Sequence, residues 1–140
     1  DAELDRLAAW VGLHKRLRPL LSTGRGVHAD HPDPHTWLHG VVAADRRHAV
    51  FCVVQLAAAT DSVPARLRFP GLDPGALYTV SVCPEIGLPT CFPPRPVPWL
   101  THGSVRLPGS ALATVGLAAP LLDPAQAVVI ELRAAPPAPA

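Results

Sequence analysis

Histidine is the residue type best suited to metal or acid–base chemistry in this sequence, and the chain contains seven of them. Four histidines and two aspartates lie close together: His28, Asp30, His31, Asp33, His35 and His39. Histidine spacings of three and four residues would stack metal ligands on one face of a helix. Pro32 and Pro34 exclude that helix, so we interpret the segment as a polar surface loop. The alternative is that loop and strand converge on a metal; we expect no metal site and no cofactor.

Eleven carboxylates could supply acid–base pairs, but most of the aspartates fall in predicted turns. These are Asp30, Asp33, Asp45, Asp73 and Asp123. Aspartate side chains favour turns because they accept hydrogen bonds from nearby backbone N–H groups. Glu131 falls on the outward face of the last predicted strand, where Arg133 is the expected partner. The serines lack a nucleophile-elbow context. We therefore expect no catalytic residue in this chain.

Cysteines and aromatic residues leave further alternatives open. Cys52 lies in the most apolar segment and is interpreted as a small buried side chain. Cys83 and Cys91 could form a disulfide in an oxidising compartment, but the odd cysteine count favours reduced thiols. Trp37 and Trp99 are candidates for stacking on sugar rings, with core or interface packing as the alternative for Trp37.

The positions of helix-capping and turn-forming residues predict one long helix followed by short strands. Residues 2–21 are rich in helix formers, with Asp1 as the cap, Pro19 near the end and Gly24 as the stop. The predicted strands cover residues 37–44, 49–56, 65–69, 78–82 and 128–133, and residues 110–115 form a short helix. The fold class is therefore mainly β: an antiparallel β-sandwich preceded by one N-terminal α-helix. Residues 28–34 are read as a turn-rich crossing and residues 84–98 as a proline-rich loop.

Length and composition exclude several classes of protein. The chain has 140 residues, 49% of them hydrophobic, which is enough for one compact domain. A net charge of +1 argues against nucleic-acid binding, and no apolar run is long enough to cross a membrane. No methionine is present, so we interpret the sequence as a fragment of a longer protein. The opening residues lack a signal-peptide layout, and we expect a cytoplasmic location.

Four segments, in order, resemble the carboxy-terminal end of family 36 glycoside hydrolases, the retaining α-galactosidases. They are Trp10 to Gly24, including Lys15 and Arg18; Trp37-Leu38-His39-Gly40-Val41-Val42 with Asp45 and residues 49–54; Phe69-Pro70-Gly71-Leu72-Asp73-Pro74 with Tyr78; and Gly109-Ser110-Ala111-Leu112 with Gly116-Leu117, Pro120 and Pro124-Ala125-Gln126-Ala127. The resemblance implies that residues 1–24 are the last helix of a catalytic (β/α)₈ barrel. It further implies that residues 25–134 are the β-sandwich domain that follows, and residues 135–140 read as a disordered Pro/Ala tail.

The resemblance also implies what this chain lacks. The catalytic aspartates of the family lie upstream of the segment that residues 4–24 resemble, so this chain alone is expected to be a non-catalytic accessory domain of a retaining glycoside hydrolase. Its expected partner is the missing barrel of the same protein. A stand-alone carbohydrate-binding or protein-interaction β-sandwich is the alternative.

The predicted helix is apolar around most of its circumference, which favours burial on two sides. Its candidate barrel-facing residues are Leu4, Leu7, Trp10, Val11 and Leu17. Only a strip near Asp5, Gly12 and Arg16 is expected to stay polar. Without the barrel, the helix is expected to mediate self-association.

Overall fold

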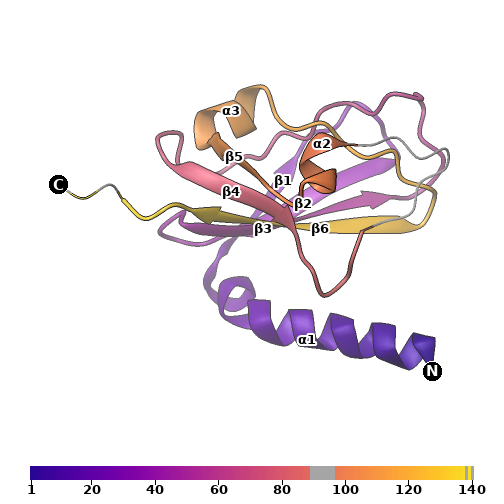
Figure 1. Ribbon diagram of the computed structural model, residues 1–140. Coiled ribbons are helices and arrows are strands. Elements are labelled where there is room, and N and C mark those ends of the chain that lie inside the picture. The colour runs from indigo at the N-terminus through magenta and orange to yellow at the C-terminus, as the bar shows by residue number, and fades with distance from the viewer. Residues whose placement is uncertain (89–96, 138, 140) are drawn as a thin grey trace.

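The fold is a curved antiparallel sheet with one long helix on its outer side. The computed structural model describes residues 1–88, 97–137 and 139. Its elements, in chain order, are α1 (Ala2–Thr23), β1 (Arg25–Ala29), β2 (Thr36–Val42), β3 (His48–Gln55), β4 (Leu77–Val82), α2 (Pro98–Thr101), β5 (Val105–Pro108), α3 (Gly109–Thr114) and β6 (Gln126–Ala134) (Figure 1).

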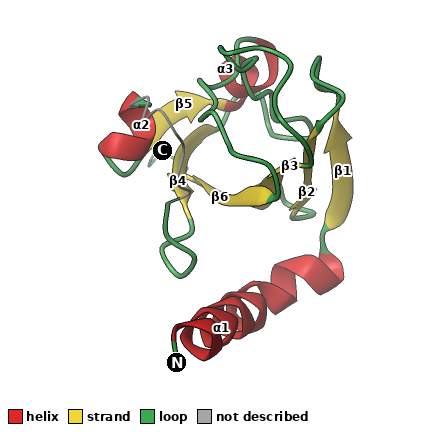
Figure 2. Ribbon diagram, turned by 90° about the vertical axis from the view of Figure 1, so that its right-hand side faces the viewer, coloured by secondary structure: helices red, strands yellow, loops and turns green. Residues whose placement is uncertain are grey.

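The six strands form one sheet in the order β1-β2-β3-β6-β4-β5, and all neighbours are antiparallel. The mainly β prediction with an N-terminal helix is confirmed. The sheet curls so that α3 and the long loops fill its concave side, while α1 lies on the convex side (Figure 2). The layer facing the sheet within the described residues is thus made of loops and short helices, which gives a sandwich-like domain.

Apolar alternation produced the core as expected. Tyr78 and Val80 of β4 and Ile130 of β6 are fully buried on the concave side. Phe51 of β3 packs edge-to-face on Phe69, with ring centroids 5.0 Å apart. Burying these large side chains removes apolar surface from water, and this burial stabilises the domain.

Three predictions about strands needed correction. Residues 65–69 are not a strand: only Leu67 pairs, with Leu117, because prolines at 64 and 70 flank the segment. The expected alternation nevertheless holds, with Leu67 and Phe69 buried and the two arginines exposed. The edge strands β1 and β5 were not predicted, since they are short and carry few apolar residues. His28 consequently lies in a strand and not in a loop.

The Tyr78 hydroxyl connects two turns, one at Arg46 and one at Asp73. Its hydroxyl donates to the carbonyl oxygen of Arg46 at 2.5 Å and accepts from the Asp73 N–H at 3.0 Å. Gly109 packs against the same turn, and a Cβ atom there would lie 2.0 Å from the Asp73 carbonyl oxygen. The Gly109 N–H also donates to the Ala76 carbonyl. These contacts join the turns at Arg46 and Asp73 to the start of α3.

Candidate docking site on the helix and sheet

Local sequence signals define both ends of α1. The Asp1 carboxylate accepts from the Glu3 N–H at 3.2 Å, which satisfies an N–H group that the helix leaves free. At the other end the Gly24 N–H donates to the Leu20 carbonyl. A Cβ at Gly24 would lie 2.4 Å from Val41, so glycine lets the helix end lie close to β2. The helix continues through Pro19 to Thr23, two residues beyond the predicted end.

One face of α1 packs on the convex side of the sheet. Leu13, Leu17 and Leu20 are buried there, at the three- and four-residue spacings of one helical face. They form a cluster with Val50 of β3, Cys83 after β4 and Val129 of β6. Leu17 was predicted to face the missing barrel, and this assignment is corrected: it is 4% exposed and packs within the domain.

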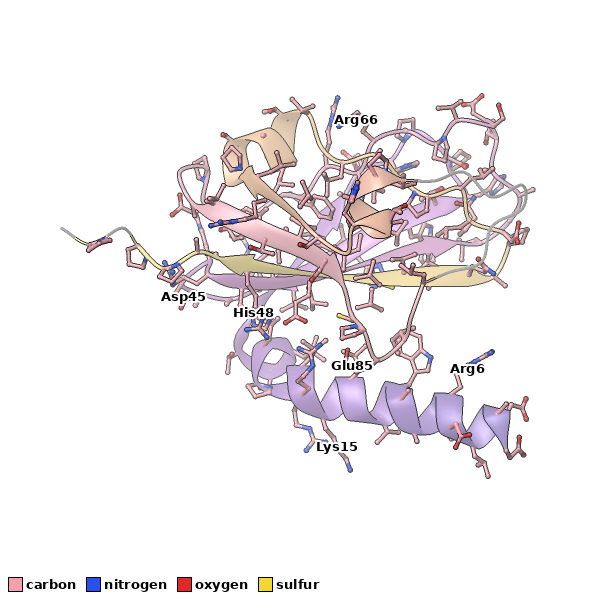
Figure 3. The ribbon with its side chains drawn as sticks, in the orientation of Figure 1. Arg6, Lys15, Asp45, His48, Arg66 and Glu85 are labelled. Carbon is pink, nitrogen blue, oxygen red and sulfur yellow. The ribbon has the colours of Figure 1, made fainter. Side chains whose placement is uncertain are left out.

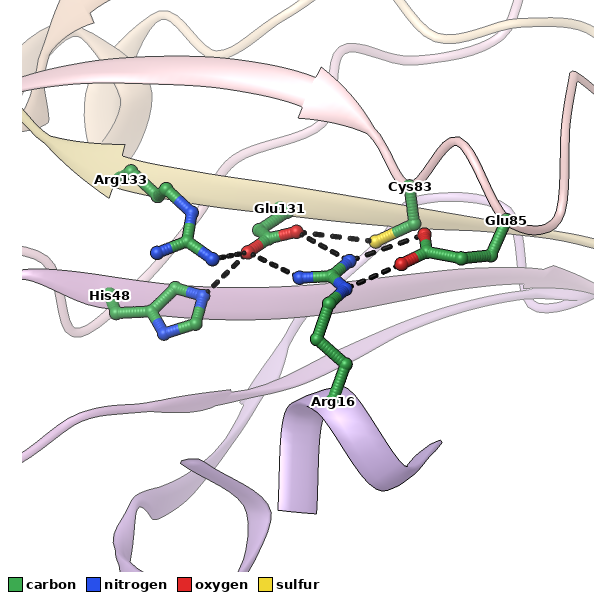
Figure 4. Close-up of polar contacts among 6 residues, drawn as sticks. All are labelled: Arg16, His48, Cys83, Glu85, Glu131 and Arg133. Atoms are coloured by element: carbon green, nitrogen blue, oxygen red, sulfur yellow. Dashed lines mark hydrogen bonds and ion pairs between the residues drawn. The ribbon is translucent and has the colours of Figure 1, made fainter. Parts of the chain in front are cut away.

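Arg16 lies on this same sheet-facing side. Its Nη2 is 2.9 Å from Glu131 Oε2, and its Nε is 2.5 Å from Oε1 of Glu85. Glu131 is also 2.8 Å from His48 Nε2 and 2.6 Å from Arg133 Nη2 (Figure 4). A carboxylate in the middle of the sheet is therefore bound by cationic or hydrogen-bonding side chains from the helix and two strands.

The prediction that Glu131 faces solvent is wrong, because the convex side of the sheet is covered by α1. Glu131 is 7% exposed, although the expected pairing with Arg133 is present. Arg16 was likewise predicted to lie on a solvent-facing polar strip of α1, but it faces the sheet. Its ion pair with Glu131 was not predicted from the sequence. The available signal was Glu131 itself, a charge between apolar residues in β6, since a buried charge requires a partner.

Burial and neighbouring charges shift the pKa values of Glu131, Arg16 and Cys83 in this cluster. Burial opposes ionisation of Glu131, but hydrogen bonds from Arg16 and His48 and the charge of Arg133 lower its pKa to about 2. Hydrogen bonding to Glu85 and Glu131 raises the pKa of Arg16, so this side chain stays charged. The Cys83 thiol donates to Glu131 at 3.8 Å, and burial together with the Glu131 charge raises its pKa to about 12. The cluster holds fixed charges and a neutral thiol, an arrangement suited to anchoring the helix.

Four large apolar residues in the first half of α1 are exposed to solvent. Leu4 is 64% exposed, Leu7 60%, Val11 44% and Trp10 39%. Figure 3 shows Lys15 projecting away from the sheet, while Glu85 and His48 lie between the sheet and α1. The helix thus has one covered face and one bare apolar face.

The two candidate sugar-stacking tryptophans lie in different environments. Trp37 of β2 is 58% exposed. Trp99 is 6% exposed, and its Nε1–H donates to the Ala118 carbonyl at 2.9 Å. Trp99 cannot present its ring to a sugar because α2 packs it into the core, so the assignment of Trp99 is wrong.

The other candidates are dispersed. No cluster of three or more His, Cys, Asp or Glu side chains able to hold a metal occurs among residues 1–88, 97–137 and 139. His28 and His39 lie side by side on paired strands, with ring centroids 6.3 Å apart. Cys52 and Cys83 carry free thiols, whereas Cys91 lies outside the described residues.

Three of the aspartates that were predicted to stabilise turns do so: Asp33, Asp45 and Asp73. The Asp33 carboxylate accepts from the N–H groups of His35 and Thr60 and from the Thr60 hydroxyl, and these bonds lower its pKa to about 2. Asp45 and Asp73 each accept from the N–H group two residues ahead. Within the described residues, no helix has the length and apolar character needed to cross a membrane.

Comparison with known proteins identifies the family of this chain. Residues 36–132 match the sequence model of the glycosyl hydrolase family 36 C-terminal domain. The chain belongs to this family. It is 34% identical to an α-galactosidase of Escherichia coli over 137 residues, which is 95% of this chain and 19% of that enzyme. The chain therefore spans about a fifth of the length of this curated relative.

Solved α-galactosidases of the family share the fold. The enzyme of Lactobacillus brevis superposes with a TM-score of 0.73 at 20% identity, covering all of this chain and 18% of that one. The AgaB enzyme of Geobacillus stearothermophilus gives a TM-score of 0.63 at 22% identity, covering 89% of this chain and 15% of that one. The match to the family 36 C-terminal domain begins at Thr36, so α1 and β1 lie ahead of it.

Proposed function

We propose that this chain is the non-catalytic C-terminal domain of a retaining α-galactosidase, and that α1 docks the domain onto the preceding catalytic barrel. The observation that carries the proposal is the two-sided character of α1. One face is packed on the sheet through Leu13, Leu17 and Leu20, while Leu4 and Leu7 are bare. A helix that packs one apolar face on its own domain and leaves a second apolar face exposed is typical of an element that lies between two domains.

The position of α1 relative to the family match supports the same conclusion. Similarity to the Escherichia coli enzyme extends over 95% of the chain, whereas the C-terminal domain match starts only at Thr36. A helix that precedes the domain in sequence and packs on it in space would connect the domain to the barrel. Arg16 and Glu131 would then fix the barrel helix on the sheet. A cytoplasmic location remains part of this proposal.

The first test concerns catalysis. Retaining glycosidases need two carboxyl groups about 5–5.5 Å apart across the scissile bond. Asp33, Asp45 and Asp73 accept hydrogen bonds from backbone N–H groups, and Glu131 is bound by Arg16, His48 and Arg133. The purified chain should therefore not hydrolyse an activated aryl α-galactoside. Turnover that copurifies with the chain and disappears on substitution of one of its aspartates would contradict the proposal.

The second test concerns docking. Leu7→Glu/Val11→Glu in the full-length α-galactosidase should lower its thermal midpoint and activity, because charges would enter the interface with the barrel. The control is Val63→Glu, since Val63 is 67% exposed in a loop distant from α1 in the sequence. Equal behaviour of the two variants would contradict docking through α1.

A stand-alone carbohydrate-binding module is the second candidate, and the exposure of Trp37 is the observation that favours it. Saturable quenching of tryptophan fluorescence by galactose, lost in Trp37→Ala, would support that function.

Sedimentation of the isolated chain provides the test for self-association through α1. A concentration-dependent dimer lost in Leu7→Glu/Val11→Glu would assign the bare helical face to a second copy.

A further inference from the structure

The convex face of the sheet is covered unevenly by α1. Three cross-strand rows of side chains on β2, β3 and β6 share this face: Val41, Val50 and Glu131; His39, Cys52 and Val129; and Trp37, Val54 and Ala127. In the first row, Val50 and Glu131 are 6% and 7% exposed because α1 lies over them. In the last row, Val54 and Ala127 are only half-buried and Trp37 is 58% exposed.

Simple dimensions explain why one helix leaves part of the sheet bare. The Trp37 row lies four residues further along the same three strands than the Val41 row, about 13 Å away at roughly 3.3 Å per residue, whereas a helix with its side chains is about 10–12 Å wide. Figure 2 shows α1 on the outer side of the sheet. A second helix-sized segment would fit beside it. We call the bare region the Trp37 corner, consisting of Trp37, His39, Cys52, Val54 and Ala127.

The Trp37 corner is continuous with the bare part of α1. A groove of about 250 Å³ between helix and sheet is lined by Trp10, Leu21 and His39. His39 also lines an adjoining groove of about 570 Å³ together with Trp37 and His28. The five residues of the corner include no carboxylate, lysine or arginine, whereas Asp30 and Asp33 line the far part of the adjoining groove. A surface of this composition suits an apolar segment, and a large exposed tryptophan is a typical anchor in such contacts.

We propose that the Trp37 corner is covered by a segment of the catalytic part of the same enzyme, packed on the sheet beside α1. This inference rests on the proposed function. Two observations favour this occupant. The family relatives are about five times longer than this chain, and α1, which lies ahead of the C-terminal domain match, already occupies the same face of the sheet. The polypeptide ahead of α1 therefore approaches the molecule on the side where Trp37 is bare.

Hydroxyl-radical footprinting read by mass spectrometry tests the inference on individual residues. Oxidation rates are compared between the 140-residue chain and the full-length α-galactosidase. In the longer enzyme Trp37 should react about tenfold more slowly, which is the ratio of its 58% exposure to the 6% exposure of Trp99 in the core. Val115, which is 57% exposed at the end of α3, serves as the control and should react equally in both proteins.

The outcomes separate the inference from the proposed function. If Leu4 and Leu7 are protected in the longer enzyme but Trp37 is not, the docking function stands and this inference is overturned. If none of these residues is protected, both fail. Protection of Trp37 in the isolated chain at high concentration would assign the corner to a second copy, and protection by galactose would assign it to a sugar; either result overturns the inference.

A substitution provides a second readout. Trp37→Ser should leave the thermal midpoint of the isolated chain unchanged, because the residue is exposed there. The same substitution should lower the midpoint of the full-length enzyme, while Val115→Ser should lower neither. An unchanged midpoint of full-length Trp37→Ser would contradict the inference.

Discussion

Arg16 in α1 and Glu131 in β6 are 115 positions apart in sequence, and their side chains form an ion pair of 2.9 Å beneath the helix. The pair joins the element that precedes the family C-terminal domain match to the central strand region of that domain. Glu131 has four cationic or hydrogen-bonding partners, Arg16, His48, Arg133 and the Cys83 thiol, and little access to water, so removing its charge should have a measurable effect on stability.

Glu131→Gln should destabilise the chain by about 2–3 kcal/mol at neutral pH, since it removes the charge that compensates Arg16 and Arg133. Chemical unfolding by urea at pH 7 measures the free energy. The control is Asp61→Asn, an exposed carboxylate in a loop, which should change stability by less than about 0.5 kcal/mol. Equal stability of Glu131→Gln and wild type would show that the ion pair contributes nothing net.

The stability difference between wild type and Glu131→Gln should depend on pH. The pKa of Glu131 is lowered from 4.5 to about 2 in the folded chain. A lowered pKa contributes stability that is complete above the unfolded pKa and is lost as pH falls through the folded value, here between about pH 5 and pH 2. Urea unfolding at several pH values should show the difference shrinking over this window. A constant difference would mean that ionisation of Glu131 is not responsible.

Two glycine substitutions should act in opposite directions. Gly109→Ala should destabilise the domain by more than about 2 kcal/mol, because its Cβ would collide with the Asp73 carbonyl, which is backbone and cannot rotate away. Gly12→Ala should stabilise the chain by about 1 kcal/mol, since its Cβ meets nothing and alanine favours the helix. Thermal unfolding of both variants measures the signs. Destabilisation by Gly12→Ala would indicate a wrong helix placement.

Tyr78→Phe should cost about 1–3 kcal/mol, because the Arg46 carbonyl and the Asp73 N–H would both lose their hydrogen-bond partner in a largely buried site. The ring stays in place, so the apolar core is retained. Amide hydrogen exchange at Asp73 should accelerate, while exchange in α1 should not. Unchanged exchange at Asp73 would show that the hydroxyl does not hold the turn.

The elements could largely be predicted from the sequence because their signals are local. Asp1, Gly24 and the helix formers between them determined α1, and alternating apolar residues determined β4 and β6. Cys52 and the valines around it marked β3 as a central strand. The spacing of glycine, proline and tyrosine in the turns carried the resemblance to family 36, since each type answers a steric or hydrogen-bonding need at its own position.

Only the tertiary structure decided which faces are covered and by what. A polar strip on a helix reads the same whether it faces water or a buried carboxylate, so the sequence did not reveal that Arg16 lies against Glu131. Trp37 and Trp99 are equally apolar, but Trp99 packs in the core and Trp37 does not. Leu67 pairs with Leu117 without forming a strand. Such outcomes depend on contacts between residues distant in the sequence, and these exist only once helix, sheet and loops are packed together.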